Sequence, residues 1–121
     1  MSSSNSRGGG PLTLEIPTTT AFEFSDWPTQ HTLGSCYGLV VRSMGVGRGI
    51  LASWRSLAGG EVKQYTALLE ESRRHAVERM VKSAKEMGGN AIVGIRFDSS
   101  EMGNGMTEVL AYGTAIFVDK D

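Results

Sequence analysis

The chain has 121 residues, of which 40% are hydrophobic and 21% are charged, and this size and composition suit one globular domain. Its formal net charge of −1 provides no overall attraction to nucleic acid or to an anionic membrane. The single cysteine, Cys36, excludes a disulfide within the chain and favours a reducing compartment. The first residues lack the apolar core of a secretory signal, so we expect a soluble, cytoplasmic protein.

The first quarter of the chain is poor in regular patterns. Residues 1–11 are rich in serine and glycine and are predicted to be disordered, whereas residues 12–121 are predicted to form a single domain. Within that domain, Leu12–Thr20 has the alternation of a short extended segment, and Ala21–Thr32 is predicted to be an irregular loop. Three aromatic residues are candidate anchors for this loop: Phe22, Phe24 and Trp27.

The longest regular pattern predicts one helix over Glu61–Met87. This segment follows Gly59-Gly60 and ends at Gly88-Gly89, and glycine pairs commonly interrupt helices. Its apolar residues recur at intervals of three, four and seven, which places them on one side of a helix with 3.6 residues per turn. The residues of this stripe are Val62, Tyr65, Leu69, Ala76, Met80, Ala84 and Met87.

Three segments have the composition of β-strands, namely Cys36–Met44, Asn90–Asp98 and Glu108–Val118. Because alternate side chains point to opposite faces, the second is predicted to place Ala91, Val93, Ile95 and Phe97 on one face. In the third strand both faces are apolar, which favours a central position. The prediction is an α+β fold of β-α-β-β topology, with an antiparallel sheet in the order 1-3-2. One long helix and a short helix over Ile50–Leu57 would cover it.

One face of this predicted sheet has no cover. A single long helix shields one side of three strands, so the other side of the third strand would expose more apolar surface than soluble monomers usually do. We therefore predict a cyclic homo-oligomer, in which neighbouring copies provide the missing cover. The alternative is that residues 12–32 fold across this face. The side chains predicted at the interface are Tyr37, Leu110, Tyr112 and Ile116.

A set of landmarks follows in order along about four-fifths of the chain: Thr18–Thr20, Tyr37–Val40, Gly59-Gly60, Tyr65, Leu69, Arg73, Ala76, Ala84, Met87-Gly88, Ala91–Ile95 and Gly113–Ile116. This ordered set resembles the YbjQ family, whose members carry a heavy-metal-binding description. The resemblance implies a subunit similar to that of dodecin, with sheet order 1-3-2, and it implies rings, commonly pentamers. Family members often carry cysteine where this chain has Tyr37, and a shift of one residue turns a strand side chain to the other face.

The residues that could bind a metal ion are few and scattered. Cys36, His31 and His75 are the candidates, whereas a closed zinc site takes four cysteine or histidine ligands. The alternative for His75 is a solvated histidine on a helix face. A ring presents each ligand once per subunit, so an interface or an axis could still gather a complete site.

Two further features suggest a small ligand. The run GVGRG at residues 45–49 lies between a predicted strand and a predicted helix, where Gly47, Arg48 and Gly49 could hold an anion. It matches neither GxGxxG nor the P-loop, and a simple glycine-rich turn is the alternative. Trp54 offers a surface on which a planar cofactor such as a flavin could stack, although a packed tryptophan is the alternative.

No motif in the sequence indicates catalysis. A nucleophile elbow, a paired-carboxylate signature and a Ser-His-Asp order are all missing from it. The basic residues of the long helix are interrupted by glutamates, which argues against a nucleic-acid partner. We expect a non-enzymatic, ring-forming protein that binds a metal ion or small ligand at a subunit interface. Flavin storage, or a scaffold with no ligand, is the alternative function.

Overall fold

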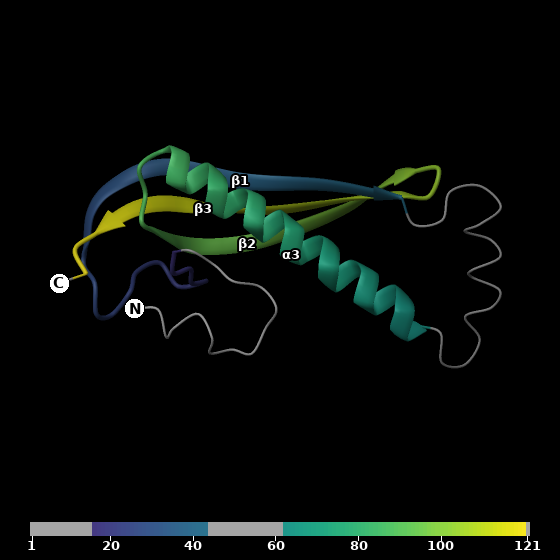
Figure 1. Ribbon diagram of the computed structural model, residues 1–121, viewed down its shortest axis with the longest axis horizontal. Helices are drawn as coiled ribbons and strands as arrows, with labels where there is room; N and C mark the ends of the chain where they lie inside the picture. Colours follow the sequence, from purple (N-terminus) through teal and green to yellow (C-terminus); the bar gives the residue numbers. More distant parts are fainter. Residues whose placement is uncertain (1–15, 44–61, 121) are drawn as a thin grey trace.

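The computed structural model describes residues 16–43 and 62–120 (Figure 1). Along the chain the elements are β1 (Thr29–Ser43), α3 (Val62–Glu86), β2 (Ala91–Gly103) and β3 (Met106–Val118). The predicted disordered segment 1–11 and the predicted short helix over Ile50–Leu57 lie outside the described residues. No helix in the described part is long and apolar enough to cross a membrane.

The three strands form one antiparallel sheet in the order β1-β3-β2, which confirms the predicted α+β topology. The strands are longer than predicted, because β1 begins at Thr29 rather than Cys36 and β2 continues to Gly103. Residues 99–103 still belong to β2, and β3 begins at Met106. Asn104 (φ 56°) and Gly105 (φ 75°) make a two-residue turn between β2 and β3. Two positive φ values at the centre of a hairpin turn match the twist of the strands and let the ladder run up to the turn.

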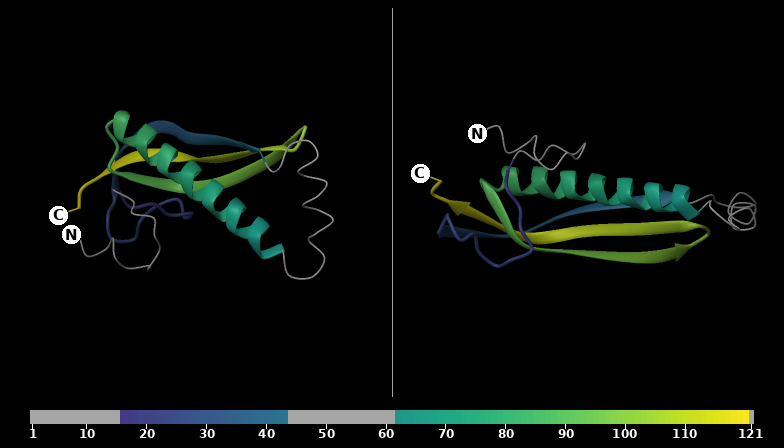
Figure 2. Two further views of the ribbon diagram at one scale, coloured as in Figure 1. Left: turned by 45° about the vertical axis from the view of Figure 1, so that its right-hand side comes forward. Right: turned by 90° about the horizontal axis from the view of Figure 1, so that it is seen from below.

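Helix α3 lies diagonally across one face of the sheet (Figures 1 and 2). Its predicted bounds are confirmed to within one residue at each end. The helix approaches β1 closely at Gly38, where an added Cβ would overlap the Ala76 carbonyl oxygen and lie 2.5 Å from the Met80 nitrogen. Only glycine fits this contact, and the helix therefore rests directly on the backbone of β1. The core beneath α3 includes Cys36, Val40, Ala76, Met80, Val81, Ala84, Ile92, Ile95, Val109, Ala111 and Ala115.

A bulge in β2 changes which side chains face the helix. Val93 pairs with Thr114 and Arg96 with Tyr112, so Gly94 and Ile95 together lie opposite one residue of β3. Gly94 has a φ of 65°, which glycine adopts readily. The prediction that Ala91, Val93, Ile95 and Phe97 share a face is therefore wrong: Ile92 and Ile95 join the core under α3, whereas Ala91 and Val93 belong to a second apolar cluster.

Residues 16–28, which we call the strap, cover part of the second face. Ile16 is buried in the core beneath α3, and the strap then passes to the far side of the sheet (Figure 2, right). There Phe24 and Trp27 pack against the second cluster, which consists of Ala91, Val93, Ile116 and Val118. The alternative in which the early residues fold across the second face is thus correct for one half of that face. Ile116, predicted at the interface, is only 2% exposed, because the strap of its own chain already covers it.

Candidate functional site

The half of the second face that the strap leaves uncovered is apolar, and we call it the open face. It follows from strand alternation, since Cys36, Gly38 and Val40 of β1 point toward α3 and the residues between them point away. The exposed fractions are 62% for Tyr37, 42% for Leu39, 49% for Val41 and 41% for Tyr112. The open face consists of Tyr37, Leu39, Val41, Leu110 and Tyr112.

The open face is regular across the two strands that carry it. Tyr37 pairs with Tyr112 and Leu39 pairs with Leu110, so a Tyr–Tyr pair and a Leu–Leu pair form two adjacent rungs on this face of the β1–β3 ladder. Directly opposed side chains on neighbouring strands are about 5 Å apart, close enough to make one continuous surface. The predicted interface residues Tyr37, Leu110 and Tyr112 are therefore brought together by the fold.

A polar row on β2 borders the open face. Arg96 pairs with Tyr112 and Asp98 pairs with Leu110, so these two charges lie beside the apolar rungs. The Arg96 guanidinium donates hydrogen bonds to the carbonyl oxygens of Thr20 (3.1 Å) and Ile95 (2.8 Å), and it lies 5.5 Å from the ring centroid of Phe22. Arg96 thereby fastens the strap to β2 at the boundary of the open face.

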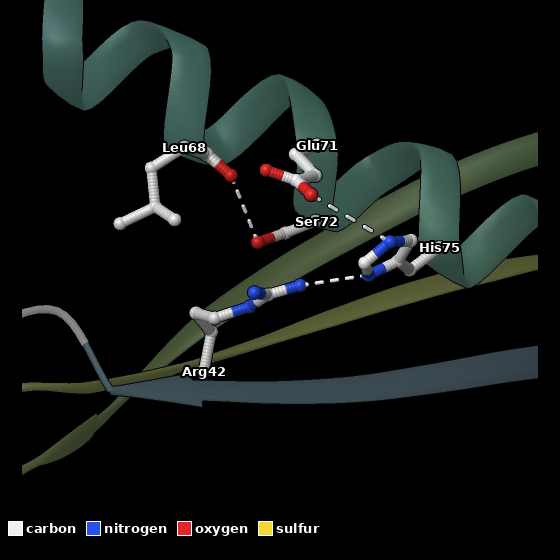
Figure 3. Close-up of polar contacts among 5 residues, drawn as sticks. All are labelled: Arg42, Leu68, Glu71, Ser72 and His75. Carbon is white, nitrogen blue, oxygen red and sulfur yellow. Dashed lines mark hydrogen bonds and ion pairs between the residues drawn. The ribbon is translucent and has the colours of Figure 1, made fainter. Parts of the chain in front are cut away.

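On the helix side of the sheet, the end of β1 is tied to α3 by a polar cluster (Figure 3). The Arg42 guanidinium donates to Nδ1 of His75 at 2.9 Å, and Nε2 of His75 lies 3.8 Å from the Glu71 carboxylate. Because arginine has no acceptor, Nδ1 must carry a lone pair, which places the imidazole proton on Nε2, toward Glu71. His75 is thus a link between two elements as well as a helix-face histidine.

The three candidate metal ligands lie apart. Cys36 is completely buried beneath α3, and this burial raises the pKa of its thiol to about 11. His31 is exposed near the other end of β1, with its ring 6.4 Å from that of Phe117. His75 contacts Arg42, which is eleven positions beyond His31 on β1 and so about 36 Å away at roughly 3.3 Å per strand residue. Among the described residues, no group of three or more histidine, cysteine or acidic residues could hold a metal ion.

The candidate anion and flavin residues are Gly47, Arg48, Gly49 and Trp54, and all four lie outside the described residues. These two binding hypotheses stay predictions, and no contact of the described residues favours either.

Sequence reasoning missed several contacts that position the open face. Two are the links from Arg42 to His75 and from Arg96 to the strap, which join residues 33 and 76 positions apart. Such long-range pairs leave no periodic signal. The bulge did leave one, because an isolated glycine inside a strand pattern, here Gly94, is typical of a bulge.

The fold and its open face define a class: a small α+β subunit with one helix across a three-stranded antiparallel sheet. Half of the other side of this sheet is apolar and is not covered by any described residue. The chain belongs to the YbjQ family, whose model, described as "Putative heavy-metal-binding", matches residues 16–119. A UPF0145 protein of Bradyrhizobium sp. (strain ORS 278) is 50% identical over 100 residues, which are 83% of this chain and 90% of that protein. A UPF0145 protein of Methanoregula boonei is 57% identical over 90 residues, covering 74% and 75% of the two chains.

A solved structure shares the fold at low sequence identity. It is the crystal structure of a DUF74-family protein of unknown function from Pediococcus pentosaceus. Its TM-score is 0.58 at 17% identity, over 86% of this chain and 98% of that one. At this identity the likeness concerns the fold alone.

Proposed function

We propose that this chain is the non-catalytic, cytoplasmic subunit of a cyclic homo-oligomer in which neighbouring copies remove the open face from water. The observation that carries the proposal is the pair of adjacent rungs on β1 and β3, Tyr37 with Tyr112 and Leu39 with Leu110. Three of these side chains are exposed, and Leu110 is half-buried. Contiguous apolar surface on a soluble protein usually marks an interaction site. Most soluble oligomers are closed assemblies of identical chains, so another copy is the simplest partner.

The energetics are of the right size for association. Fully burying a leucine, valine or aromatic side chain contributes about 1.5–3 kcal/mol, so the side chains of the open face could together contribute on the order of 5–10 kcal/mol per copy. Association costs about 4–15 kcal/mol in lost translational and rotational freedom. The open face alone is therefore near balance, and a stable assembly needs further contacts between copies.

We place the metal site suggested by the family description at an interface between subunits. The described part of one chain gathers no three ligands for a metal ion, but a ring repeats each ligand once per copy. His31 and His75 are the accessible candidates. Cys36 is not, because metals bind the thiolate and its buried thiol stays protonated near neutral pH.

Mass measurement on protein purified without an affinity tag tests the proposal. We expect native mass spectrometry and light scattering to give a multiple of the 13.0 kDa chain mass, with five copies as the resemblance to pentameric rings implies. A single species of 13.0 kDa at micromolar concentration would contradict it. Elemental analysis of the same sample tests the metal role separately: less than one transition-metal ion per assembly, with no uptake on titration, removes the metal and leaves the assembly standing.

A further inference from the structure

Among residues 16–43 and 62–120, nothing pairs with part of the outer edge of β1 or of β2, and the two unpaired stretches match in length and position. On β2, the strap pairs in parallel with the first residues only, through bonds such as Thr19 N to Ile92 O (3.0 Å) and Gly94 N to Ala21 O (2.7 Å). Within the described chain, no backbone pairs with the outer edge of β2 over residues 96–103.

The outer edge of β1 is regular over the same levels of the sheet. Register shifts between Thr29 and His31 and between Thr32 and Gly34 disturb the first part of β1, and irregular edges pair poorly with other strands. From residue 35 to residue 43 the strand is regular. The Leu39 carbonyl points away from β3, because it accepts a hydrogen bond from the Arg79 guanidinium of α3 at 2.7 Å. Since N–H and C=O of one residue point to the same side of a strand, Tyr37, Leu39 and Val41 direct theirs outward.

Opposite charges lie at the same height on the two free edges. Arg42 of β1 and Glu101 of β2 both pair with Thr107 of β3, and residues opposite the same β3 residue project to the same face of the sheet. On the open face, the levels of Tyr37 and Arg96 also coincide, since both pair with Tyr112. A second copy whose β2 lies beside β1 at the same level would therefore place its Glu101 next to Arg42.

We infer that the regular edge of β1 pairs in parallel with the free edge of β2 from a second copy of this chain, with Arg42 beside Glu101 of the partner subunit. The pairing is parallel because β1 and β2 both run antiparallel to β3. It joins two different edges, so it repeats around a ring instead of ending at a dimer. It rests on the proposed function and specifies the contact by which that ring forms.

Two existing contacts are compatible with this pairing. The Leu39 carbonyl has a second lone pair after accepting from Arg79, and the Arg42 guanidinium has further N–H donors after binding His75. With α3 on the outside of the closed sheet, the open face lies on the inside, and Arg96 lies between Tyr112 of its own chain and the partner subunit's Tyr37. Edge pairing therefore provides the additional contacts that burial of the open face requires.

An engineered disulfide tests the pairing with little ambiguity. In the double variant Arg42→Cys/Glu101→Cys, β3 separates the two positions within one chain by about 9–10 Å, twice the strand spacing. A disulfide needs Cα atoms within about 7 Å, so a 42–101 bond can form only between chains. We expect mild oxidation to link most of the protein into covalent oligomers on non-reducing gels. The ladder should stop at the subunit number of the intact assembly.

The controls keep this test specific. Arg42→Cys/Ser100→Cys is matched, because Ser100 is the neighbour of Glu101 but points to the other face, and it should give no cross-link. The native Cys36 is buried in every variant. Each single variant should also remain uncross-linked, since the same residue of two copies does not meet in this arrangement.

The outcomes separate this inference from the proposed function. A monomeric wild-type protein would contradict both the proposed function and the edge pairing. A wild-type oligomer whose double variant assembles when reduced but forms no 42–101 disulfide overturns the edge pairing alone, as do single variants that cross-link to themselves. Hydrogen exchange on the wild-type oligomer gives an answer even if the variants misfold. Protected amides at Tyr37, Leu39 and Val41 support the pairing, and fast exchange at all three overturns it.

Discussion

At the scale of single residues, Cys36 shows how burial decides chemistry. The side chain is fully buried between β1 and α3, and no charged group is needed to explain its behaviour: loss of water alone raises the pKa of the thiol from 9.0 to about 11. A thiol with this pKa is almost entirely protonated near neutral pH, and the protonated form is a poor nucleophile and a poor metal ligand. Cys36 therefore acts as a small apolar residue of the core.

Cys36 should be unreactive until the chain unfolds. At pH 8 we expect a disulfide reagent to label native protein at least about 100-fold more slowly than protein in denaturant, because both exposure and thiolate fraction are lost on folding. The folded pKa lies above the unfolded value of 9.0, so both states are protonated below pH 9. Between pH 9 and about 11 only the unfolded state loses its proton, and the free energy of unfolding should fall as pH rises.

Denaturant titrations of Cys36→Ala provide the control for this pH effect. The variant should show a smaller loss of stability between pH 9 and 11 than the wild type, since it has no thiol to ionise. Equal losses in the two proteins would show that another group causes the decline, and rapid labelling of the native wild type would show that α3 opens readily over Cys36.

At the scale of elements, sequence patterns predicted what depends on local periodicity. The single-sided stripe of α3 and the alternation in β1 and β3 predict the helix, the sheet order and the faces of Tyr37, Leu110 and Tyr112, as observed. The faces of β2 were predicted wrongly beyond Gly94, because one inserted residue reverses every side chain after it. The strap over Ile116 had no periodicity to reveal it, since it is held by aromatic packing and backbone bonds to β2.

The strap should contribute measurably to the stability of the subunit. Trp27 lies partly buried against the second cluster, with its ring 5.4 Å from that of Phe24 and the Lys120 ammonium 5.5 Å from its centroid. Full removal of a buried tryptophan side chain costs about 3–5 kcal/mol, so for this half-buried one we expect Trp27→Ala to lower the free energy of unfolding by about 2 kcal/mol. Urea titration at fixed protein concentration measures the loss.

Phe22→Ala is the matched control for the strap. Phe22 belongs to the same segment and is also aromatic, but it is 76% exposed and its described ring contact is with Arg96. Exposed cation–π contacts contribute about 0.5–1 kcal/mol, so this variant should lose less than half as much as Trp27→Ala. Equal losses from the two substitutions would contradict the packing of Trp27 against the second cluster.

At the scale of the whole molecule, each apolar surface of the sheet has a different cover. Helix α3 covers one face, the strap covers half of the other, and the open face remains on the half nearer the β2–β3 turn. Charge is also unevenly divided along the sequence: residues 42–85 carry nine basic and four acidic side chains, whereas residues 86–121 carry two basic and six acidic ones. A chain with complementary surfaces at different places is suited to contacts that repeat around a ring.

A charge placed on the open face should therefore dissociate the assembly before it unfolds the subunit. In Tyr112→Asp, a carboxylate replaces a side chain that is 41% exposed in one chain but that the ring would bury, where an unpaired charge is costly. Phe117→Asp is the control, because Phe117 lies on the other face of β3 with a similar exposure of 39%. We expect light scattering to give 13.0 kDa for Tyr112→Asp and the wild-type mass for Phe117→Asp, with circular dichroism showing folded protein in both. A Tyr112→Asp variant that stays fully assembled would mean that the open face is not the surface that neighbouring copies cover.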